Sequence, residues 1–143
     1  MSDSNEAKIC HIYEEWHAGT NSYDVARVIA LYAEKATLET PTILAIYPHL
    51  NEGILRGRSE IEKFFIKVLG VLSKEFRELY RSDLFLSTGK LLTWEYPRKT
   101  PTGEQVDLVE LMDIADGLIV YHRVYWGWKG FQVLLAAGRK NSS

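Results

Sequence analysis

The sequence has little of several features that mark well-known protein classes. Its 143 residues include one cysteine, Cys10, which excludes an internal disulfide. No apolar run approaches the roughly 20 residues that a membrane-spanning helix requires. Lysine and arginine are scattered along a chain of net charge −2, unlike the basic patches of nucleic-acid-binding proteins. We therefore expect neither a membrane span nor a nucleic-acid partner.

Motifs for metal, phosphate or covalent chemistry are also missing. His11 and His17 fall on different faces of the first predicted helix, and His49 has no second histidine nearby, so no zinc-ligand spacing is present. There is no phosphate-binding loop, no dinucleotide fingerprint and no G-x-S-x-G nucleophile motif. We therefore expect no metal ion and no organic cofactor.

The composition is that of one globular domain. Hydrophobic residues make up 46% and charged residues 25% of the chain, as in average soluble proteins. A chain of 143 residues has the usual length of a domain and can bury a sizeable core. Residues 1–143 are therefore predicted to form a single domain. The polar start MSDSNEAK is unlike a signal peptide, which favours a cytoplasmic protein.

Helical spacing of apolar residues predicts three helices in the first half of the chain. The first covers Glu6–Ala18 and stops at Gly19. The second follows a cap at Asn21 or Ser22, and the third starts with the capping box Ser59-x-x-Glu62. The predicted core-facing positions are Ile9, Ile12, Tyr13 and Trp16, then Val25, Val28, Ile29 and Tyr32, then Ile61, Phe64, Phe65, Val68, Leu69 and Leu72.

The rest of the chain is predicted to form strands. The segment ATLETP, Ala36–Pro41, has strand character, Thr42–Gly57 is expected to be irregular, and residues 1–5 and 139–143 are expected to be frayed tails. Short, turn-rich links between later strands predict antiparallel pairing. Helices followed by such a meander indicate an α+β fold with the helices on one sheet face. The four later strands are predicted at Phe76–Ser87, Leu91–Arg98, Glu104–Ile114 and Leu118–Trp128.

Two polar residues interrupt the apolar face of the last predicted hairpin. The segment Ala115-Asp116-Gly117 suits a three-residue loop that pairs Ile114 with Leu118, and the same register places Glu110 opposite His122. Side chains directly opposite lie about 5 Å apart at Cβ, so these two are predicted to touch. Their face also carries Leu108, Met112, Val120, Val124 and Trp126, and the other face carries Asp107, Val109, Leu111, Asp113, Ile119, Tyr121, Arg123 and Tyr125.

A carboxylate and an imidazole on an apolar face cost free energy unless they satisfy each other or meet water. The neighbouring carboxylate raises the pKa of an imidazole, whereas burial lowers it, so such a pair can exchange a proton near neutral pH. By itself the pattern leaves two interpretations open. The pair is either catalytic or holds two strands in register, and the second is the commoner use of a single Glu–His pair.

Three segments together resemble a known superfamily. In chain order they are ALYAEKATLETP (30–41), ILRGRSEIEKFF (54–65) and DIADGLIVYHRVYW (113–126). They resemble the nuclear-transport-factor-2-like (NTF2-like) superfamily, in its branch of SnoaL-like and ketosteroid-isomerase-like proteins. The resemblance implies a cone-shaped, cystatin-like α+β fold. In this fold three N-terminal helices pack on a curved antiparallel sheet around an apolar pocket, and homodimers through the outer sheet face are common.

Only some of the ketosteroid isomerase site residues have chemically similar residues at the matching positions of this sequence. Their base is an aspartate, and their oxyanion hole combines a tyrosine with a protonated aspartate. The base position corresponds to Thr40, and the adjacent Glu39 should point to the other strand face. The protonated acid corresponds to Glu110 and the tyrosine falls near Tyr13. The resemblance also implies that His122 faces a ligand, because many SnoaL-like relatives carry a pocket histidine there.

These observations favour a cofactor-free acid–base enzyme, an isomerase, cyclase or lyase, that binds a small apolar organic molecule. We expect His122 to move the proton, Glu110 to orient it or stabilise its cation, and Tyr13 to donate a hydrogen bond. The alternative is a non-catalytic ligand-binding or dimerisation module of the same fold, which Thr40 at the base position favours. A homodimer is expected in either case. The predicted substrate contacts are Trp16, Tyr32, Trp94, Leu108, Met112, Val124 and Trp126.

Overall fold

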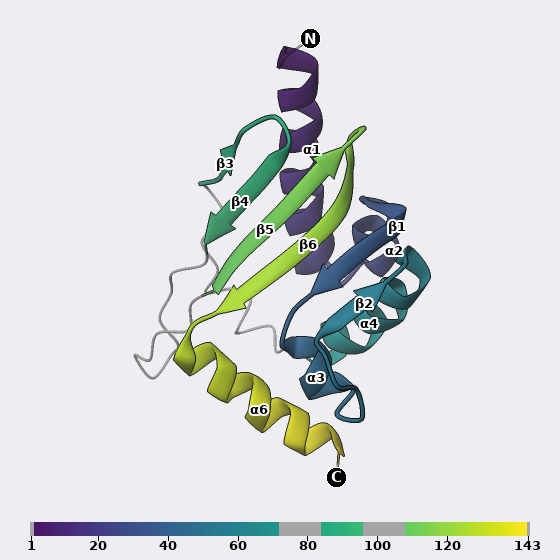
Figure 1. Ribbon diagram of the computed structural model, residues 1–143, viewed down its shortest axis with the longest axis vertical. Coiled ribbons are helices and arrows are strands. Elements are labelled where there is room, and N and C mark those ends of the chain that lie inside the picture. Colours follow the sequence, from purple (N-terminus) through teal and green to yellow (C-terminus); the bar gives the residue numbers. More distant parts are fainter. Residues whose placement is uncertain (1, 72–83, 96–107, 143) are drawn as a thin grey trace.

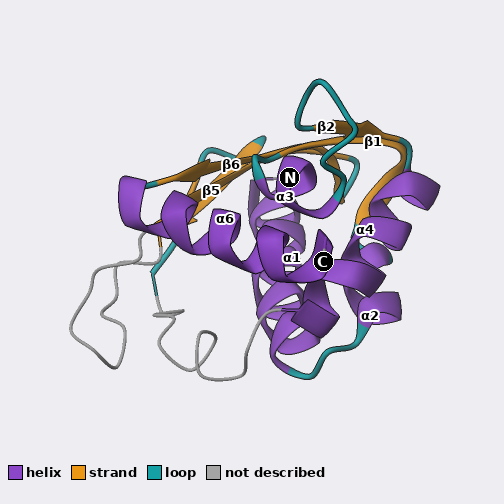
Figure 2. Ribbon diagram, turned by 90° about the horizontal axis from the view of Figure 1, so that it is seen from below, coloured by secondary structure: helices purple, strands orange, loops and turns teal. Residues whose placement is uncertain are grey.

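Helices cover one face of a mixed sheet in the computed structural model, which describes residues 2–71, 84–95 and 108–142 (Figure 2). Within these residues the sheet has six strands: β1 (Tyr32–Glu39), β2 (Ile54–Arg56), β3 (Leu86–Ser87), β4 (Leu91–Glu95), β5 (Leu108–Ala115) and β6 (Leu118–Trp126). Their order is β2-β1-β6-β5-β4-β3 (Figure 1). All neighbours are antiparallel except β1 and β6, which are parallel. The predicted α+β class is confirmed, with one parallel pair that the antiparallel meander did not include.

The described helices are α1 (Ser2–Asn21), α2 (Val25–Ile29), α3 (Thr42–Ile46), α4 (Arg58–Val71) and α6 (Trp128–Ser142). The apolar stripes predicted for the first and third helices are confirmed, since their members in α1 and α4 are all buried. Leu72 lies outside the described residues. The predicted stop at Gly19 is wrong, because α1 continues to Asn21. Gly19 instead allows close packing: a Cβ at this position would lie 2.7 Å from Cγ2 of Val28 in α2.

The second predicted helix is shorter than its apolar pattern indicated. It begins after Asp24, whose carboxylate accepts a hydrogen bond from the backbone N–H of Arg27 at 3.0 Å, so the predicted caps at Asn21 or Ser22 are wrong. It ends at Ile29, and Tyr32 is the first residue of β1, where it pairs with Ile119 of β6. Pairing with a distant strand therefore decides the conformation of Tyr32.

Two segments that were not predicted as regular structure have it. The stretch predicted as irregular contains α3 and β2. The last strand ends at Trp126 rather than Trp128, and α6 then replaces most of the predicted C-terminal tail. Leu134 of α6 is buried and α6 contacts α3, so tertiary packing supports this helix. The predicted strand residues 76–83, 96–98 and 104–107 lie outside the described part of the chain.

The β5–β6 hairpin has a tighter turn and a different register from those predicted. Asp116 and Gly117 have φ values of 52° and 75° and form a two-residue turn, with Ala115 opposite Leu118. A bulge between Asp113 and Ile114 then shifts the pairing by one more residue. Together these changes amount to a two-residue shift, which restores the predicted facing beyond the bulge because side chains alternate with period two.

Between the turn and the bulge, the predicted orientation of the β6 side chains is wrong. Ile119 was expected on the outer face but is fully buried, whereas Val120 is only partly buried. Beyond the bulge, Met112 lies opposite His122 and Glu110 lies opposite Val124. Glu110 and His122 are thus diagonal rather than direct neighbours.

Candidate functional site

A mostly apolar cavity of about 90 Å³ lies between the inner sheet face and the helices. Every described helix except α2 contributes to its wall, as do β1, β5 and β6. Its polar groups include a carboxylate, an imidazole and threonine hydroxyls. The lining residues are Trp16, Thr20, Leu38, Thr40, Thr42, Phe64, Phe65, Val68, Leu69, Leu108, Glu110, His122, Val124, Trp126 and Leu134.

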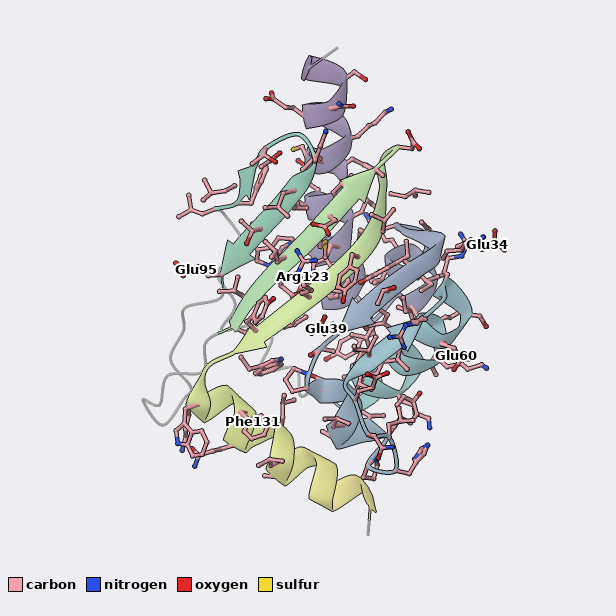
Figure 3. The ribbon with its side chains drawn as sticks, viewed as in Figure 1. Glu34, Glu39, Glu60, Glu95, Arg123 and Phe131 are labelled. Atoms are coloured by element: carbon pink, nitrogen blue, oxygen red, sulfur yellow. The ribbon has the colours of Figure 1, made fainter. Side chains whose placement is uncertain are left out.

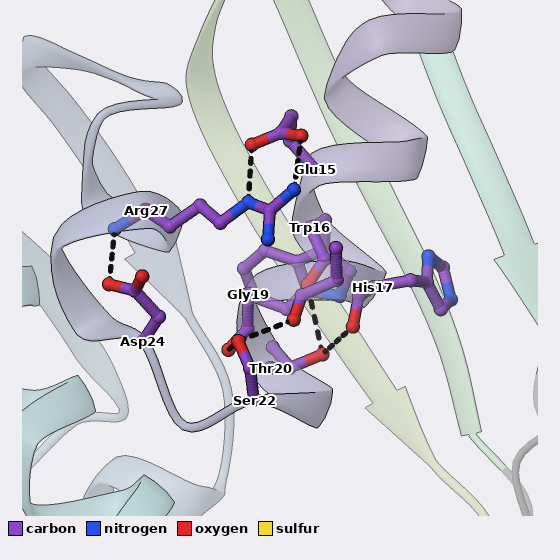
Figure 4. Close-up of polar contacts among 9 residues, drawn as sticks. Glu15, Trp16, His17, Gly19, Thr20, Ser22, Asp24 and Arg27 are labelled. Atoms are coloured by element: carbon purple, nitrogen blue, oxygen red, sulfur yellow. Dashed lines mark hydrogen bonds and ion pairs between the residues drawn. The ribbon is translucent and has the colours of Figure 1, made fainter.

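The last turns of α1 bring Trp16 and Thr20 to the cavity, and contacts to α2 hold this end of the helix (Figure 4). Arg27 of α2 donates two hydrogen bonds to the carboxylate of Glu15, at 2.6 and 2.7 Å. The hydroxyl of Thr20 donates to the carbonyl oxygen of Trp16 at 2.9 Å. A partly exposed ion pair adds little stability, so the orientation of α1 with Trp16 toward the cavity follows from the burial of Ile9, Ile12 and Trp16 rather than from this pair.

Glu110 and His122 form a buried hydrogen-bonded pair in the cavity wall. Nε2 of His122 bonds Oε2 of Glu110, and Nδ1 of His122 lies 2.7 Å from the hydroxyl oxygen of Tyr32. The exposed fractions are 7% for Glu110, 1% for His122 and 0% for Tyr32. The contact predicted from the sequence is therefore present, although the register that led to it is wrong. The diagonal between two antiparallel strands is short enough for long side chains to bridge.

The three groups define one arrangement of protons when His122 is neutral. Burial, reinforced by the charge of Glu110, raises the pKa of Tyr32 well above its usual value, so its hydroxyl keeps its proton. An ionised carboxylate can only accept hydrogen bonds, so the imidazole proton lies on Nε2 and is donated to Glu110. Nδ1 then accepts the hydrogen bond of Tyr32. Both ring nitrogens of His122 are thus engaged, whereas Oε1 of Glu110 has no hydrogen-bond partner among the described residues.

Four of the predicted substrate contacts line the cavity: Trp16, Leu108, Val124 and Trp126. Tyr32, Trp94 and Met112 do not, and the structure places them in the core behind its wall. Tyr32 is the partner of His122, and Met112 lies opposite His122 on the neighbouring strand.

Tyr13, which was predicted to donate a hydrogen bond at the site, is also absent from the cavity wall. It belongs to an aromatic cluster with His17, Phe85 and Trp94, at ring-centroid distances of 4.4, 4.4 and 5.3 Å. The orientation of α1 explains this placement, because its cavity-facing positions are Trp16 and Thr20. Burial lowers the pKa of His17, which lies against the same cluster.

Several cavity residues were not predicted as site residues. Leu38 and Thr40 alternate along β1 and its end, a pattern that would have placed both on the inner face. The apolar face of α4 was predicted as core, and nothing local distinguishes core from cavity wall. Leu134 could not be found from the strand pattern, because it depends on the fold of α6 across the end of the sheet.

The opposite sheet face carries a separate polar network (Figure 3). The hydroxyl of Tyr121 donates to Oε2 of Glu39 at 2.6 Å, and Arg123 donates to both carboxylate oxygens of Asp113 at 3.1 and 3.3 Å. Glu39 therefore points away from the cavity, as expected from strand alternation. Glu39 therefore cannot supply a carboxylate base to the cavity from the position next to Thr40.

Two further properties concern the described ranges only. Residues 2–71, 84–95 and 108–142 contain no cluster of three or more histidine, cysteine, aspartate or glutamate side chains suited to a metal ion. No helix in those ranges combines the length and the apolar character needed to cross a membrane.

Comparisons with known proteins agree with this architecture. The model of the SnoaL-like domain matches residues 13–122. A SnoaL-like protein of unknown function from Burkholderia thailandensis E264 superposes with a TM-score of 0.67 at 18% identity, covering 85% of this chain and 95% of that one. A steroid delta-isomerase from Pseudomonas aeruginosa gives 0.66 at 15% identity, with coverages of 95% and 92%.

SalBIII, described as an epoxide hydrolase/cyclase-like enzyme with a role in pyran ring formation in the polyether salinomycin, gives a TM-score of 0.62 at 20% identity. The superposition covers 91% of this chain and 97% of that one. A search of the curated proteins finds no match. At these identities the structural likenesses establish the NTF2-like fold, and the domain match covers most of the chain. The protein belongs to the SnoaL-like domain family.

Proposed function

We propose that this protein binds a small, mainly apolar organic molecule in its cavity and transfers a proton on it without a cofactor. The observation that supports this proposal is that only one of the two carboxylate oxygens of Glu110 has a hydrogen-bond partner among the described residues. One carboxylate oxygen is held by buried His122, and the other has no hydrogen-bond partner among the described residues although Glu110 lines the cavity. A carboxylate fixed in this way is a suitable general base.

The proposal gives the two residues different roles from those expected from the sequence, and the hydrogen bonds of His122 support this change. Neither ring nitrogen of His122 is free to take a proton from a ligand, because Tyr32 and Glu110 occupy both. Glu110 is therefore the group that contacts the ligand, and His122 is a positioning residue that donates to it. Tyr13 has no role in this scheme, because it does not line the cavity.

This arrangement suits reactions that need only one proton acceptor in an apolar site. In an isomerisation, Glu110 takes a proton from one carbon and returns it to another. In a dehydration, it takes the proton from carbon and passes it to the neighbouring hydroxyl, which leaves as water as the C–O bond breaks and the C=C bond forms. In a cyclisation, it takes the proton of a hydroxyl that adds to the C=C bond of an enone and returns that proton to the α-carbon, so that the O–H and C=C π bonds break as the C–O and C–H bonds form. Similar folds described as a steroid delta-isomerase and an epoxide hydrolase/cyclase-like enzyme support this class of chemistry.

The size of the cavity limits the ligand. Typical small-molecule pockets measure about 300–1,000 Å³, whereas this cavity measures about 90 Å³. A compact ligand of one or two rings is therefore favoured over a polycyclic one. Leu134 of α6 forms part of the wall, so displacement of that helix is one way in which the cavity could admit a larger ligand.

The alternative is a non-catalytic ligand-binding or dimerisation module. The small cavity, the engaged imidazole and Thr40 at the position of the family's base favour it. The outer sheet face exposes apolar surface at Val109 and Tyr125, which are 37% and 55% exposed, and we propose this face as the homodimer contact. Size-exclusion chromatography with light scattering on the wild type and on Tyr125→Glu tests the dimer, since a charge there should shift it to monomer.

Deuterium exchange and thermal shift together test the catalytic proposal. Ring ketones, enones and hydroxy ketones are incubated in D2O with the wild type, Glu110→Gln, and the control Glu34→Gln, whose carboxylate is exposed on β1. We expect some compounds to raise the melting temperature of all three proteins, and only the wild type and the control to exchange carbon-bound hydrogen. Binding without exchange in the wild type would support the non-catalytic ligand-binding module, and no binding at all would overturn the catalytic proposal and leave the dimerisation module.

A further inference from the structure

We infer that Thr40 and Thr42 form a hydrogen-bond-donating subsite that selects ligands carrying an oxygen acceptor, such as the carbonyl of a ring ketone. The inference rests on the proposed function in one respect, since it assumes that a ligand occupies the same cavity. It adds the chemical class of that ligand and the direction in which it is bound.

Thr40 and Thr42 together have one more hydroxyl proton than their hydrogen bonds use. Oγ1 of Thr40 lies 3.1 Å from Oγ1 of Thr42 and accepts the backbone N–H of Thr42 at 3.3 Å. Two hydroxyls that bond each other use one hydroxyl proton and leave the second unused, whichever of them is the donor. Neither side chain has another hydrogen-bond acceptor among the described residues, and their exposed fractions are 3% and 6%. Both line the cavity, so the unused proton is available to a group inside it.

The sheet places this donor across the cavity floor from Glu110. Glu39 of β1 pairs with Arg123 of β6, so Thr40, the next residue, lies beside Val124. Val124 in turn lies opposite Glu110 of β5. Thr40 directly after β1, Val124 on β6 and Glu110 on β5 thus form one row, and all three line the cavity. Neighbouring strands lie about 4.8 Å apart, so the backbones of Thr40 and Glu110 are separated by roughly 10 Å with an apolar side chain between them.

Charge then fixes the orientation of the ligand. A carbonyl oxygen beside the carboxylate of Glu110 would meet a like partial charge in an apolar site, whereas at the threonines it meets a donor. A carbonyl compound is therefore bound with its oxygen at Thr40 and Thr42 and its hydrogen-bearing carbon toward Glu110. Pockets that offer a buried donor discriminate against analogues that leave it unpaired. One neutral hydrogen bond corresponds to a preference of about 2-fold to 12-fold.

The experiment compares two probes of nearly the same shape, 1-indanone and indane, by titration of tryptophan fluorescence and by calorimetry. The proteins are the wild type, the double variant Thr40→Val/Thr42→Val, which keeps the side-chain shape and removes both hydroxyls, and the control Thr37→Val. Thr37 lies on β1 outside the cavity wall. A double variant is needed because either remaining hydroxyl could turn its proton to the ligand.

We expect the wild type and the control to bind 1-indanone about 2-fold to 12-fold more tightly than indane, and the double variant to bind the two equally. Equal binding by the wild type, or a preference that survives in the double variant, would overturn the subsite and leave the ligand-binding cavity intact. Binding of neither probe by the wild type would count against the cavity itself as a site for ring compounds of this size.

A second measurement needs no variant. The infrared carbonyl stretch of 1-indanone bound to the wild type should lie below its frequency in an alkane solvent, because a hydrogen bond weakens the C=O bond. A bound carbonyl that absorbs at the alkane frequency has no donor, and this result would overturn the subsite even if the double variant failed to fold.

Discussion

Replacement of Tyr32 by phenylalanine isolates the hydrogen bond that fixes His122. The hydroxyl of Tyr32 lies 2.7 Å from Nδ1 of His122, and both side chains are fully buried. The phenylalanine ring can keep the contacts that Tyr32 makes with Trp16 and Phe65, at centroid distances of 6.3 and 5.9 Å. Tyr32→Phe therefore removes one oxygen atom and one hydrogen bond and leaves the surrounding packing in place.

The expected loss in the free energy of unfolding follows from the burial of His122, whose Nδ1 remains after the hydroxyl is removed. Without Tyr32, Nδ1 of His122 is a buried acceptor with no donor, which costs about 1–3 kcal/mol. A domain has about 5–15 kcal/mol of total stability, so the loss is substantial. For a chain of this size each kcal/mol corresponds to roughly 4 °C in melting temperature.

The assay is equilibrium unfolding in urea, with the slope m expected to be unchanged because the folded packing is retained. The matched control is Tyr121→Phe, since the hydroxyl of Tyr121 donates to Glu39 at 2.6 Å on the solvent side of the sheet. Water can replace that bond, so we expect a smaller loss, about 0.5–1.5 kcal/mol. Nitrogen-15 NMR of His122 should also show a changed Nδ1 resonance in Tyr32→Phe and not in the control.

Two results would refute this reasoning. One is a loss for Tyr32→Phe no greater than that for Tyr121→Phe, which would mean that Nδ1 is not left unpaired in the core. The other is an unchanged Nδ1 resonance, which would mean that Tyr32 does not bond the imidazole in solution.

Three further predictions concern alkaline pH, a glycine of α4 and the packing of α1. Burial raises the pKa of Tyr32 well above its ordinary value of 10.0, so its contribution to stability is fully present below pH 10 and is lost as the pH rises further. Urea unfolding at a series of alkaline pH values should therefore show a smaller decline in the free energy of unfolding for Tyr32→Phe than for the wild type. Equal declines would contradict the burial of a protonated Tyr32 hydroxyl. Gly70→Ala should stabilise α4 by up to about 1 kcal/mol, because nothing lies within 4 Å of the new Cβ. Gly19→Ala should destabilise the protein, because its Cβ would lie 2.7 Å from buried Val28, and a stabilised Gly19→Ala variant in the same assay would argue against the close approach of α1 and α2.

Local sequence determined the elements whose signals are complete within one segment. The apolar stripes of α1 and α4 recur at helical spacing and are buried as predicted, because one face of each helix must leave water whatever it packs against. Asp116-Gly117 specified a turn. Alternation along β5 and the later part of β6 placed Glu110 and His122 on the buried face, and this facing survived a two-residue error in register because side chains alternate with period two.

Only the tertiary structure decided the features that depend on distant partners. Tyr32 fits a helical stripe but pairs with β6, and this pairing places its hydroxyl beside His122, behind the cavity wall. The bulge that sets the β5–β6 register and the fold of α6 over the cavity have no complete local signal. The cavity joins residues from α1 to α6. Among the described residues Oε1 of Glu110 has no hydrogen-bond partner in it, and no local pattern predicts which polar atom of a cavity is left without one. A periodic pattern specifies which face of an element is buried, but the identity of the atoms that meet that face is fixed only when all the elements pack together.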